Sequence, residues 1–376
     1  MKKIKSAGFT AGILAAAVMV NSAFTGFVRA SDEAAAYTSH SQISENYIDN
    51  SGLVPAYADD ADVALIQSDN GDNLTPEWVE SIILTEVNVE TASTDGKFSG
   101  MIKALDHLQE AGVNGVWLTP INDNGGTGAS RYSNYGPHTI APELTGAYNY
   151  TEGWQVLKVF VDEAHKRNIR VFLDIITWGT AKTAPLYTEH SDWYTGEEIY
   201  GGYQFDWSNQ DLNNWFKEQM VSIIETTGAD GFRADCGSQF SGTQLFRDVR
   251  GTLLAKGIKI AMFSECAEER DGTFDFEEHS VTNANASGNV FWNTADFYTE
   301  NNIVDAVKSG TTLGTADLLA AGEGGKGRFY SSLISCHDNE QYGSKNLVSI
   351  GYGAILAPFI PMWYIGEEWN NAVTVS

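Results

Sequence analysis

Apolar residues from residue 76 onward follow two alternating spacings, one typical of helices and the other of strands. Residues 98–112 place Met101, Leu105 and Leu108 on one helical face and end at Gly112, which predicts an amphipathic helix. Similar helices are predicted at 153–168, 215–224 and 241–256. Short apolar runs between the helices predict strands. The predicted strands cover residues 81–89, 113–121, 169–176, 230–235, 258–265, 290–294, 328–336 and 360–366.

This alternation of strands with helices or long loops predicts a parallel sheet. Eight strands within about 300 residues favour an α/β fold of the (β/α)8 TIM-barrel type over the alternative, a doubly wound open sheet. The barrel would span 76–376, with a short insertion at about 177–210. A glycine pattern at 322–327 is spaced as in dinucleotide-binding loops, but it follows a helical stretch instead of a strand and does not support the alternative. Ten residues follow residue 366, too few for an eighth helix, so we expect a barrel truncated after its eighth strand.

The first 75 residues have a different character from the barrel region. Residues 1–30 combine a basic start, an apolar stretch and a small-x-small close, the pattern of a secretory signal peptide. Asn21 and Ser22 interrupt the apolar stretch, which argues against the alternative of a retained membrane anchor. Residues 31–75 are polar and acidic and predict an N-terminal extension. We therefore expect a secreted, extracellular protein with no stable membrane insertion after signal cleavage.

The charge balance and the cysteines limit the partners. Asp and Glu outnumber Lys and Arg by 49 to 23, and the formal net charge is −26. Such a surface repels phosphate backbones, which argues strongly against nucleic acid as a partner and suits a neutral polysaccharide. The chain has an odd number of cysteines, and their spacing implies neither a disulfide framework nor a zinc site. We therefore interpret them as small buried side chains; they are Cys236, Cys266 and Cys336.

Acidic residues end several of the predicted strands. In a (β/α)8 barrel the carboxyl ends of the strands meet at the face that carries the chemistry. Carboxylates that converge there repel one another and lose hydration, a cost that points to function. The candidates are Asp174, Asp235, Glu265 and Asp338, from the third, fourth, fifth and seventh predicted strands.

Paired carboxylates of this kind suit glycoside hydrolysis, in which one attacks the anomeric carbon and the other protonates the leaving oxygen. Arg233, two residues before Asp235, is expected to lower the pKa of that carboxyl and so favour it as the nucleophile. Glu265 lies in an apolar stretch, where burial would raise its pKa as a general acid requires. Metal-assisted hydrolysis is the competing chemistry, but the seven histidines form no H-x-H or H-x-x-x-H pair.

Four segments carry a resemblance to a known family. "FLDII", "GFRAD", "FSE" and "SCHDN", in this chain order, resemble the strand-end regions of the α-amylase family, glycoside hydrolase family 13. "EAGVNGVWLTPI", "FVDEAHKRNIRVFLDII", "NQDLNN" and "PMWYIGEEW" are also similar to family signatures. The resemblance covers roughly residues 80–370.

The resemblance implies a retaining double displacement with Asp235 as nucleophile and Glu265 as general acid/base. Asp338 would stabilise the oxocarbenium-like transition state, and Asp174 would be a structural aspartate behind the reacting groups. Three further residues are implied to contact or position the substrate: Arg233, which would hold Asp235; His337, which would donate to a sugar hydroxyl; and Tyr135 of "SNYGP", which would stack on the sugar.

The sequence also departs from the family. Where the family has Asn-His after the third-strand aspartate, this chain has Thr177-Trp178. That asparagine is a calcium ligand in many amylases, so calcium binding is in question and Asp211 of "NQDLNN" is the remaining candidate ligand. Ser238-Gln239 replace a Lys-His pair that contacts substrate in many members. Trp178 falls in a loop at the catalytic end, where its ring could stack on a sugar.

These observations predict a secreted retaining glycosidase that hydrolyses α-glucosidic bonds of starch- or glycogen-type polysaccharides or oligosaccharides. No cofactor is expected to be required. Two alternatives remain open: an α-glucan transglycosidase that uses the same residues, and a catalytically silent glucan-binding barrel.

Overall fold

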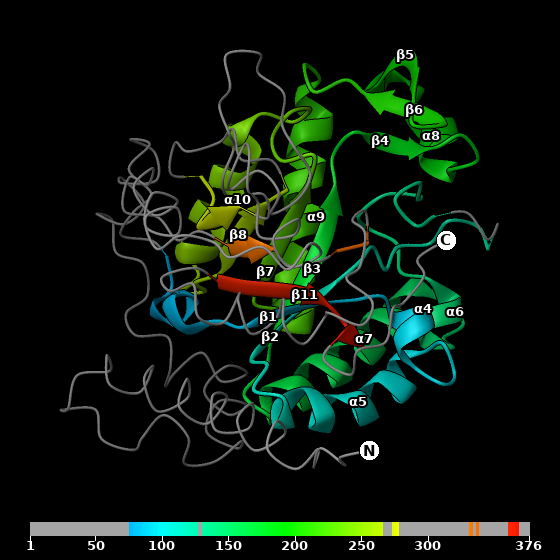
Figure 1. Cartoon of the computed structure of the whole chain (residues 1–376). Coiled ribbons are helices and arrows are strands. Elements are labelled where there is room, and N and C mark those ends of the chain that lie inside the picture. Colours follow the sequence, from blue (N-terminus) through cyan, green and yellow to red (C-terminus); the bar gives the residue numbers. More distant parts are fainter. Residues whose placement is uncertain are drawn as a thin grey trace, which may run out of the picture.

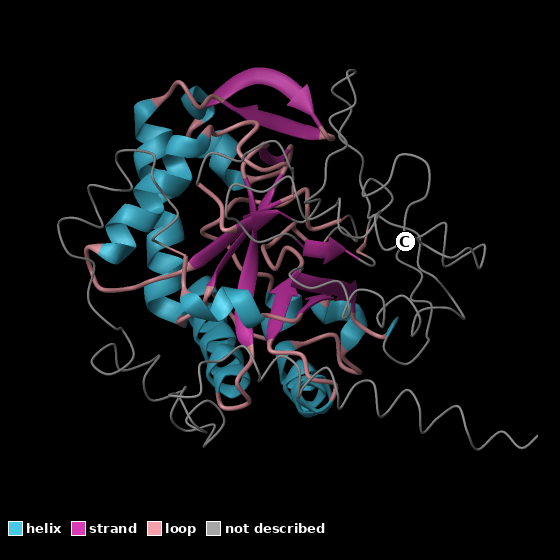
Figure 2. Ribbon diagram, turned by 60° about the vertical axis from the view of Figure 1, so that its left-hand side comes forward, coloured by secondary structure: helices cyan, strands magenta, loops and turns pink. Residues whose placement is uncertain are grey.

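The computed structural model describes residues 75–126, 130–265, 273–277, 331–333, 336–337 and 360–367. Eight strands form one sheet in the order β10-β11-β1-β2-β3-β7-β8-β9, and every pair is parallel. The strands are β1 Leu84–Val87, β2 Gly115–Leu118, β3 Arg170–Ile176, β7 Gly231–Asp235, β8 Ala261–Ser264, β9 Phe276–Glu277, β10 Ser331–Leu333 and β11 Ile360–Tyr364. They curl about a common axis with helices outside (Figures 1 and 2).

The strand order distinguishes the barrel from the open-sheet alternative. Neighbours in the sheet are neighbours along the chain, and the last described strand, β11, pairs with the first, β1. In a doubly wound open sheet, by contrast, the order of the strands reverses at an interior strand. The predicted (β/α)8 barrel is therefore confirmed over the described strands.

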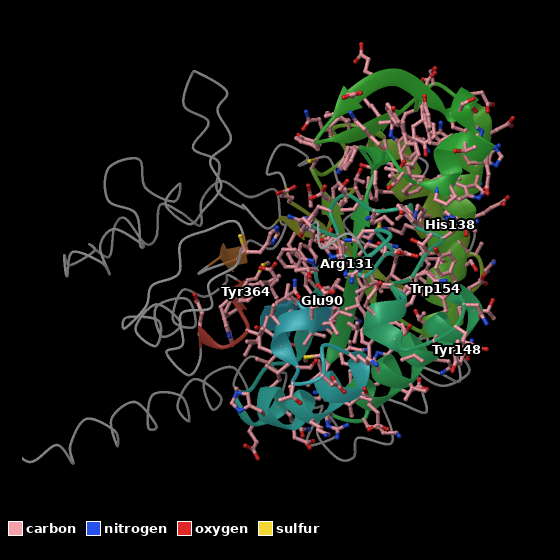
Figure 3. The ribbon with its side chains drawn as sticks, turned by 90° about the vertical axis from the view of Figure 1, so that its right-hand side faces the viewer. Glu90, Arg131, His138, Tyr148, Trp154 and Tyr364 are labelled. Atoms are coloured by element: carbon pink, nitrogen blue, oxygen red, sulfur yellow. The ribbon has the colours of Figure 1, made fainter. Side chains whose placement is uncertain are left out.

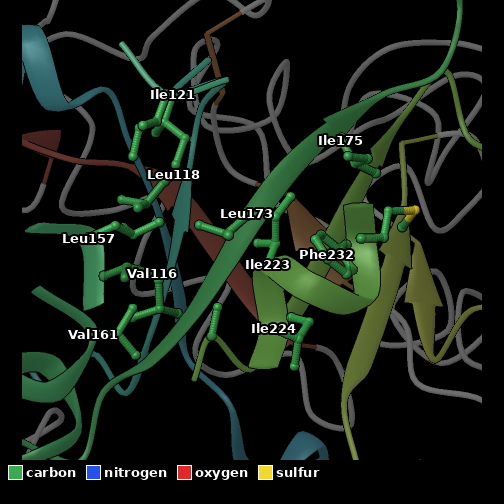
Figure 4. Close-up of a cluster of buried hydrophobic side chains, with 14 of the residues drawn as sticks. Val116, Leu118, Ile121, Leu157, Val161, Leu173, Ile175, Ile223, Ile224 and Phe232 are labelled. Carbon is green, nitrogen blue, oxygen red and sulfur yellow. The ribbon is translucent and has the colours of Figure 1, made fainter. Parts of the chain in front are cut away.

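The helices outside the sheet bury one face each against it. The main helices are α5 Phe98–Glu110, α7 Tyr150–His165, α9 Gln210–Thr227 and α10 Thr243–Leu254, with the short α4 Val89–Ala92 and α6 Pro142–Thr145. The 3-10 helix η3 Glu77–Ser81 instead packs through Val79 against the apolar cluster inside the barrel. Met101, Leu105 and Leu108 of α5 are fully buried, as their spacing predicts. Side chains that point outward from β2 and β3, such as Val116 and Leu173, meet Leu157 and its neighbours in the core between sheet and helices (Figure 4).

A second apolar cluster fills the inside of the barrel. Alternate residues of β2, β3 and β8 point inward and include Trp117, Phe172 and Phe263. The Phe263 ring lies edge to face with Trp117 and with Phe172, with centroids 5.7 and 5.4 Å apart, respectively. This interior layer forms a floor beneath the strand ends. Gly231, with φ of 158°, allows β7 to approach β8 closely, because a Cβ there would lie 1.6 Å from the carbonyl oxygen of Ala261.

The chain between β3 and α9 forms a small separate sheet. Its strands β4 Gly179–Ala181, β5 Tyr194–Ile199 and β6 Gly202–Phe205 are antiparallel in the order β4-β6-β5. α8 Pro185–Glu189 and the 3-10 helix η4 Ser191–Trp193 connect β4 to β5. This sheet projects from the end of the barrel at which β3 finishes (Figure 1).

Several sequence predictions fall on residues that the structure does not describe. These are the signal peptide, most of the N-terminal extension, the strand at 290–294, Cys266 and Asp338. Counted from β1, the sixth described strand of the sheet is β9, which the apolar pattern did not indicate. None of the described helices has the length and apolar character needed to cross a bilayer.

Candidate active site

Arg233 is the centre of the group of acids at the strand ends. Its side chain is completely buried, and it lies in β7 directly opposite Asp174 of β3. Nη1 donates to both carboxylate oxygens of Asp174 at 3.2 Å and to Oδ1 of Asp235 at 2.9 Å, while Nη2 lies 3.1 Å from Oε1 of Glu265. The structure therefore brings together three of the four predicted acids, from three adjacent strands, around one guanidinium.

Asp235 and Glu265 lie close to each other as well as to Arg233. Oxygen atoms of the two carboxyl groups and the sulfur of Cys236 all lie within 4.8 Å of one another. The backbone N–H of Cys236 donates to Oε2 of Glu265 at 2.5 Å, and its thiol lies 3.8 Å from Oδ2 of Asp235. Cys236 has a φ of 55°, which is uncommon for a residue with a side chain. This backbone turn at the end of β7 aims the N–H at Glu265.

Burial changes the protonation expected for this group. Only 7% of Asp235 is exposed, and this burial is the largest cause that raises the pKa of its carboxyl to about 8. Arg233 lowers that pKa, whereas the charges of Glu265 and Asp174 raise it. Burial likewise raises the pKa of Asp174 to about 6 despite Arg233. Arg233 does lower the pKa of Asp235, as the sequence predicts, but the low pKa predicted for this carboxyl is wrong, because the loss of hydration outweighs one shared cation.

Tyr132 contacts the acids. Its hydroxyl donates to Oδ2 of Asp174 at 2.8 Å, and Trp117 Nε1 donates to the same oxygen at 3.1 Å. Burial raises the pKa of Tyr132 well above its usual value, so its hydroxyl keeps its proton and remains a donor. The guanidinium of Arg233 lies over the Trp117 ring, 4.7 Å from its centroid.

The predicted sugar-stacking residue, Tyr135, lies apart from these contacts. Its hydroxyl is 3.3 Å from Oγ1 of Thr183, and its tip lies against Gly125. Among the described contacts, Tyr132 and not Tyr135 lies beside the acids, through its bond to Asp174. Arg131 anchors this loop, since its Nη2 donates to Glu90 at 2.5 Å (Figure 3).

Trp178 is placed differently from the prediction. Trp178 is only 2% exposed, and its ring packs against Gly202. The ring also lies edge-on to that of Tyr200, with the two centroids 5.5 Å apart. The prediction that Trp178 stacks on a sugar is therefore wrong, because its ring faces are enclosed at the base of the small sheet. Tyr200, in the turn between β5 and β6, is 62% exposed. Partial loss of hydration raises the pKa of its hydroxyl, and Cys236, Asp235 and Glu265 raise it further. An exposed aromatic ring so close to the acids is a candidate sugar contact that the sequence analysis missed.

His337 meets an acid that the sequence analysis also missed. Its backbone N–H and ring Nδ1 both contact Glu86, a fully buried residue of β1, at 2.9 and 2.6 Å. The His337 ring stacks on Tyr132 with centroids 4.8 Å apart. The only signal in the sequence was a charged residue near the carboxyl end of an otherwise apolar strand.

Asp211 lies away from these groups, exposed in the first turn of α9. Its backbone N–H is capped by the side chain of Asn209 at 2.9 Å. In the described residues, two groups of three potential metal ligands occur, and Asp211 is in neither: one is Glu86 with Cys336 and His337, the other Asp235 with Cys236 and Glu265. The second group already surrounds Arg233, whose charge opposes a cation.

The strand order and the buried acids at the strand ends define a (β/α)8 barrel with a candidate active site at one end. Residues 82–203 match the model for the α-amylase catalytic domain, and the predicted resemblance to the α-amylase family is confirmed. In fold, the chain is similar to the maltogenic α-amylase AmyB from Thermotoga neapolitana, with a TM-score of 0.63 and 20% identity over 79% of this chain and 70% of that one. An α-amylase from Lactobacillus plantarum gives a TM-score of 0.62 with 18% identity, covering 80% and 74%.

Curated relatives match a shorter part of the chain. The α-amylase MalA of Haloarcula japonica is 24% identical over 191 residues, which are 43% of this chain and 26% of MalA. The trehalose synthase/amylase TreS of Mycobacterium tuberculosis is 27% identical over 165 residues, 40% of this chain and 24% of TreS. A cyclomaltodextrinase of Bacillus sp. is 26% identical over 181 residues, 41% and 31%. The chain thus spans about a quarter to a third of the length of these relatives.

Proposed function

We propose that this chain is a secreted retaining glycosidase that hydrolyses α-glucosidic bonds of starch- or glycogen-type glucans. The observation that carries the proposal is the distance between the two reacting carboxyl groups, since oxygens of Asp235 and Glu265 lie within 4.8 Å of each other. Retaining glycosidases hold their two carboxyl groups about 5 Å apart, whereas inverting enzymes need roughly 6.5–9.5 Å to admit a water between them. Secretion is proposed from the sequence of residues 1–30.

In the proposed reaction, the Asp235 carboxylate attacks the anomeric carbon and the bond from that carbon to the leaving glycosidic oxygen breaks. Glu265 gives its proton to that oxygen, so the leaving sugar departs with a hydroxyl group. Glu265, now ionised, then takes a proton from a water molecule, whose oxygen displaces Asp235 and returns the enzyme to its starting state. Asp338 is proposed as the transition-state stabiliser from the family resemblance.

The proposed reaction also requires a particular protonation of the site. The reaction starts with one ionised and one protonated carboxyl, so the Asp235–Glu265 pair must hold a single proton. The pKa near 8 at Asp235 means that the pair keeps such a proton through neutral pH. Glu265 must carry it when substrate is bound, while Arg233 Nη1 stabilises the charge on Asp235 at 2.9 Å.

The names of relatives support α-glucans as the substrate class. They include α-amylases, a cyclomaltodextrinase and, among solved structures of similar fold, an α-amylase complexed with acarbose. Trehalose synthases are also among them, which favours glycosyl transfer as a second candidate. Transfer uses the same covalent intermediate and differs only in whether water or a sugar hydroxyl reaches it.

The experiment compares the full chain with the variant Asp235→Asn on soluble starch, pullulan and maltose. We expect the wild type to release sugars whose new reducing end is the α-anomer, seen by ¹H NMR within the first minutes. Asp235→Asn should lose activity by about a thousandfold or more, because the nucleophile is gone. Asp248→Asn, which changes an exposed carboxylate on α10, should keep the wild-type rate.

Each outcome separates the candidates. Isomerised or lengthened products from maltose with little hydrolysis would favour transfer. A β-anomeric product would overturn the retaining mechanism. Equal turnover by the wild type and Asp235→Asn would contradict catalysis at this site and favour the silent glucan-binding barrel.

A further inference from the structure

Glu86 uses both of its carboxylate oxygens on one residue. Oε2 accepts the backbone N–H of His337 at 2.9 Å, and Oε1 lies 2.6 Å from Nδ1 of the His337 ring. Glu86 is fully buried in β1, and the two residues are 251 positions apart in the chain. A buried carboxylate is costly unless it is paired and hydrogen-bonded. The pairing therefore fixes both the backbone and the ring of His337.

This contact determines which ring nitrogen of His337 can form a hydrogen bond with a substrate. A carboxylate accepts but does not donate, so the proton between the two residues lies on Nδ1. Any bond to a sugar hydroxyl then falls to Nε2. The negative charge of Glu86 also favours the imidazolium form, in which Nε2 carries a proton and acts as a donor.

The ring plane of His337 is held by a side chain of β2 and by one from the loop that follows β2. Tyr132 stacks on His337 with an interplanar angle of 17°, and Trp117 meets it edge-on with centroids 6.0 Å apart. Both of these residues also donate to Asp174, which accepts from Arg233. The orientation of His337 is thus connected by direct contacts to the guanidinium that holds the two reacting acids.

We propose that Glu86 is a positioning residue, which holds the imidazole of His337 in the orientation and protonation state that donates from Nε2 to a sugar hydroxyl at the cleavage point. The role of His337 rests on the proposed function, whereas the effect of Glu86 on the His337 ring does not. Among the residues that the structure describes, the titratable groups around this ring include Glu86 of β1, Tyr132 after β2, Asp174 of β3 and the adjacent Cys336.

The first test does not depend on activity. In the full chain, the imidazole resonances of His337 are assigned by their loss in His337→Gln and are followed by NMR as the pH is raised. In Glu86→Gln, where the charge is removed and the size kept, we expect the titration midpoint of His337 to fall by about one pH unit or more. An unchanged midpoint would overturn the inference.

The second test is a double-mutant cycle on starch hydrolysis. We expect Glu86→Ala to lower kcat/KM by about tenfold or more, the effect of losing a charge-assisted hydrogen bond, and to have no further effect in a His337→Ala background. Thr85→Val is the matched control, because Thr85 is equally buried in β1 and its hydroxyl donates to the carbonyl of Trp363 at 3.0 Å. Its effect should be the same in both backgrounds.

The two proposals fail in different ways. A wild-type chain that is inactive on all glucans would contradict the proposed function, while the NMR titration would still decide the role of Glu86. An active wild type in which the effects of Glu86→Ala and His337→Ala simply multiply would overturn the positioning role. Urea unfolding of each variant identifies losses of activity that come from loss of folding.

Discussion

Replacing Asp235 by asparagine should make the folded protein more stable than the wild type at neutral and higher pH, although the substitution removes the proposed nucleophile. The pKa of Asp235 is raised to about 8 in the folded state, against an ordinary aspartate value in the unfolded chain. The folded state therefore binds one more proton than the unfolded state throughout the interval between these two pKa values. By proton linkage, the stability that this group contributes is fully present below about pH 4 and is lost as the pH rises to about 8.

The magnitude follows from the width of that interval. Each pH unit within it costs the wild type about 1.4 kcal/mol of unfolding free energy, because one extra proton is released on unfolding. Between pH 5 and pH 8 the loss amounts to about 4 kcal/mol as an upper limit. An asparagine side chain at this position is neutral at every pH and similar in shape to the protonated aspartic acid, so the variant should lose none of this stability.

The assay is urea unfolding of the full chain at pH 5, 6, 7 and 8 at constant ionic strength. We expect the wild type and Asp235→Asn to have similar unfolding free energies at pH 5, with the variant increasingly more stable toward pH 8. Asp248→Asn, at an exposed carboxylate, should follow the wild type over the whole range. A variant whose stability falls with pH as steeply as that of the wild type would refute the reasoning.

The remaining predictions concern single contacts. Arg233→Lys should reduce kcat at least about a hundredfold and lower the urea midpoint, because a lysine ammonium lacks the planar fork that places Nη1 on Asp174 and Asp235 and Nη2 beside Glu265. Tyr132→Phe removes the 2.8 Å bond to Asp174, a loss of about 1–2 kcal/mol in unfolding free energy with a matching loss of kcat, whereas Tyr135→Phe should leave kcat nearly unchanged in the same assay. Gly231→Ala should destabilise the fold by about 3 kcal/mol or more, measured by thermal unfolding, because its Cβ would lie 1.6 Å from a backbone oxygen of β8.

Local patterns in the sequence were sufficient for most of the barrel. The buried runs of β1, β2, β3, β7 and β8 and the apolar faces of α5 and α7 are regular enough for their spacing to identify them. β9 could not be predicted in this way, because Phe276–Glu277 is too short to show a period. It is positioned instead by Asp275, whose Oδ2 accepts from Met262 N at 2.7 Å and from Arg250 at 2.8 Å. Such contacts between distant residues leave no periodic pattern.

The candidate site could likewise be predicted only in part from local patterns in the sequence. The convergence of Asp174, Asp235 and Glu265 followed from strand ends alone, because parallel strands in a barrel finish at one face. The protonation of Asp235 could not be predicted from the sequence. Arg233 is visible two residues before it, whereas the burial of Asp235 depends on the whole fold. Glu86 was missed for a related reason: a lone acid in a strand gives no indication of a partner 251 positions away.

The pairing of the first described strand with the last has a consequence for how the protein is made. During synthesis β1 emerges long before β11, so the edge of β1 that later bonds to β11 stays open while most of the barrel is translated. The cluster of Arg233 with its three acids can assemble from β3, β7 and β8 alone, because these strands are consecutive in the sheet. The contact between Glu86 and His337 must wait for a residue 251 positions further along the chain, and closing so long a segment is slow. In a nascent chain, the acids around Arg233 can therefore come together before the contact between Glu86 and His337 forms.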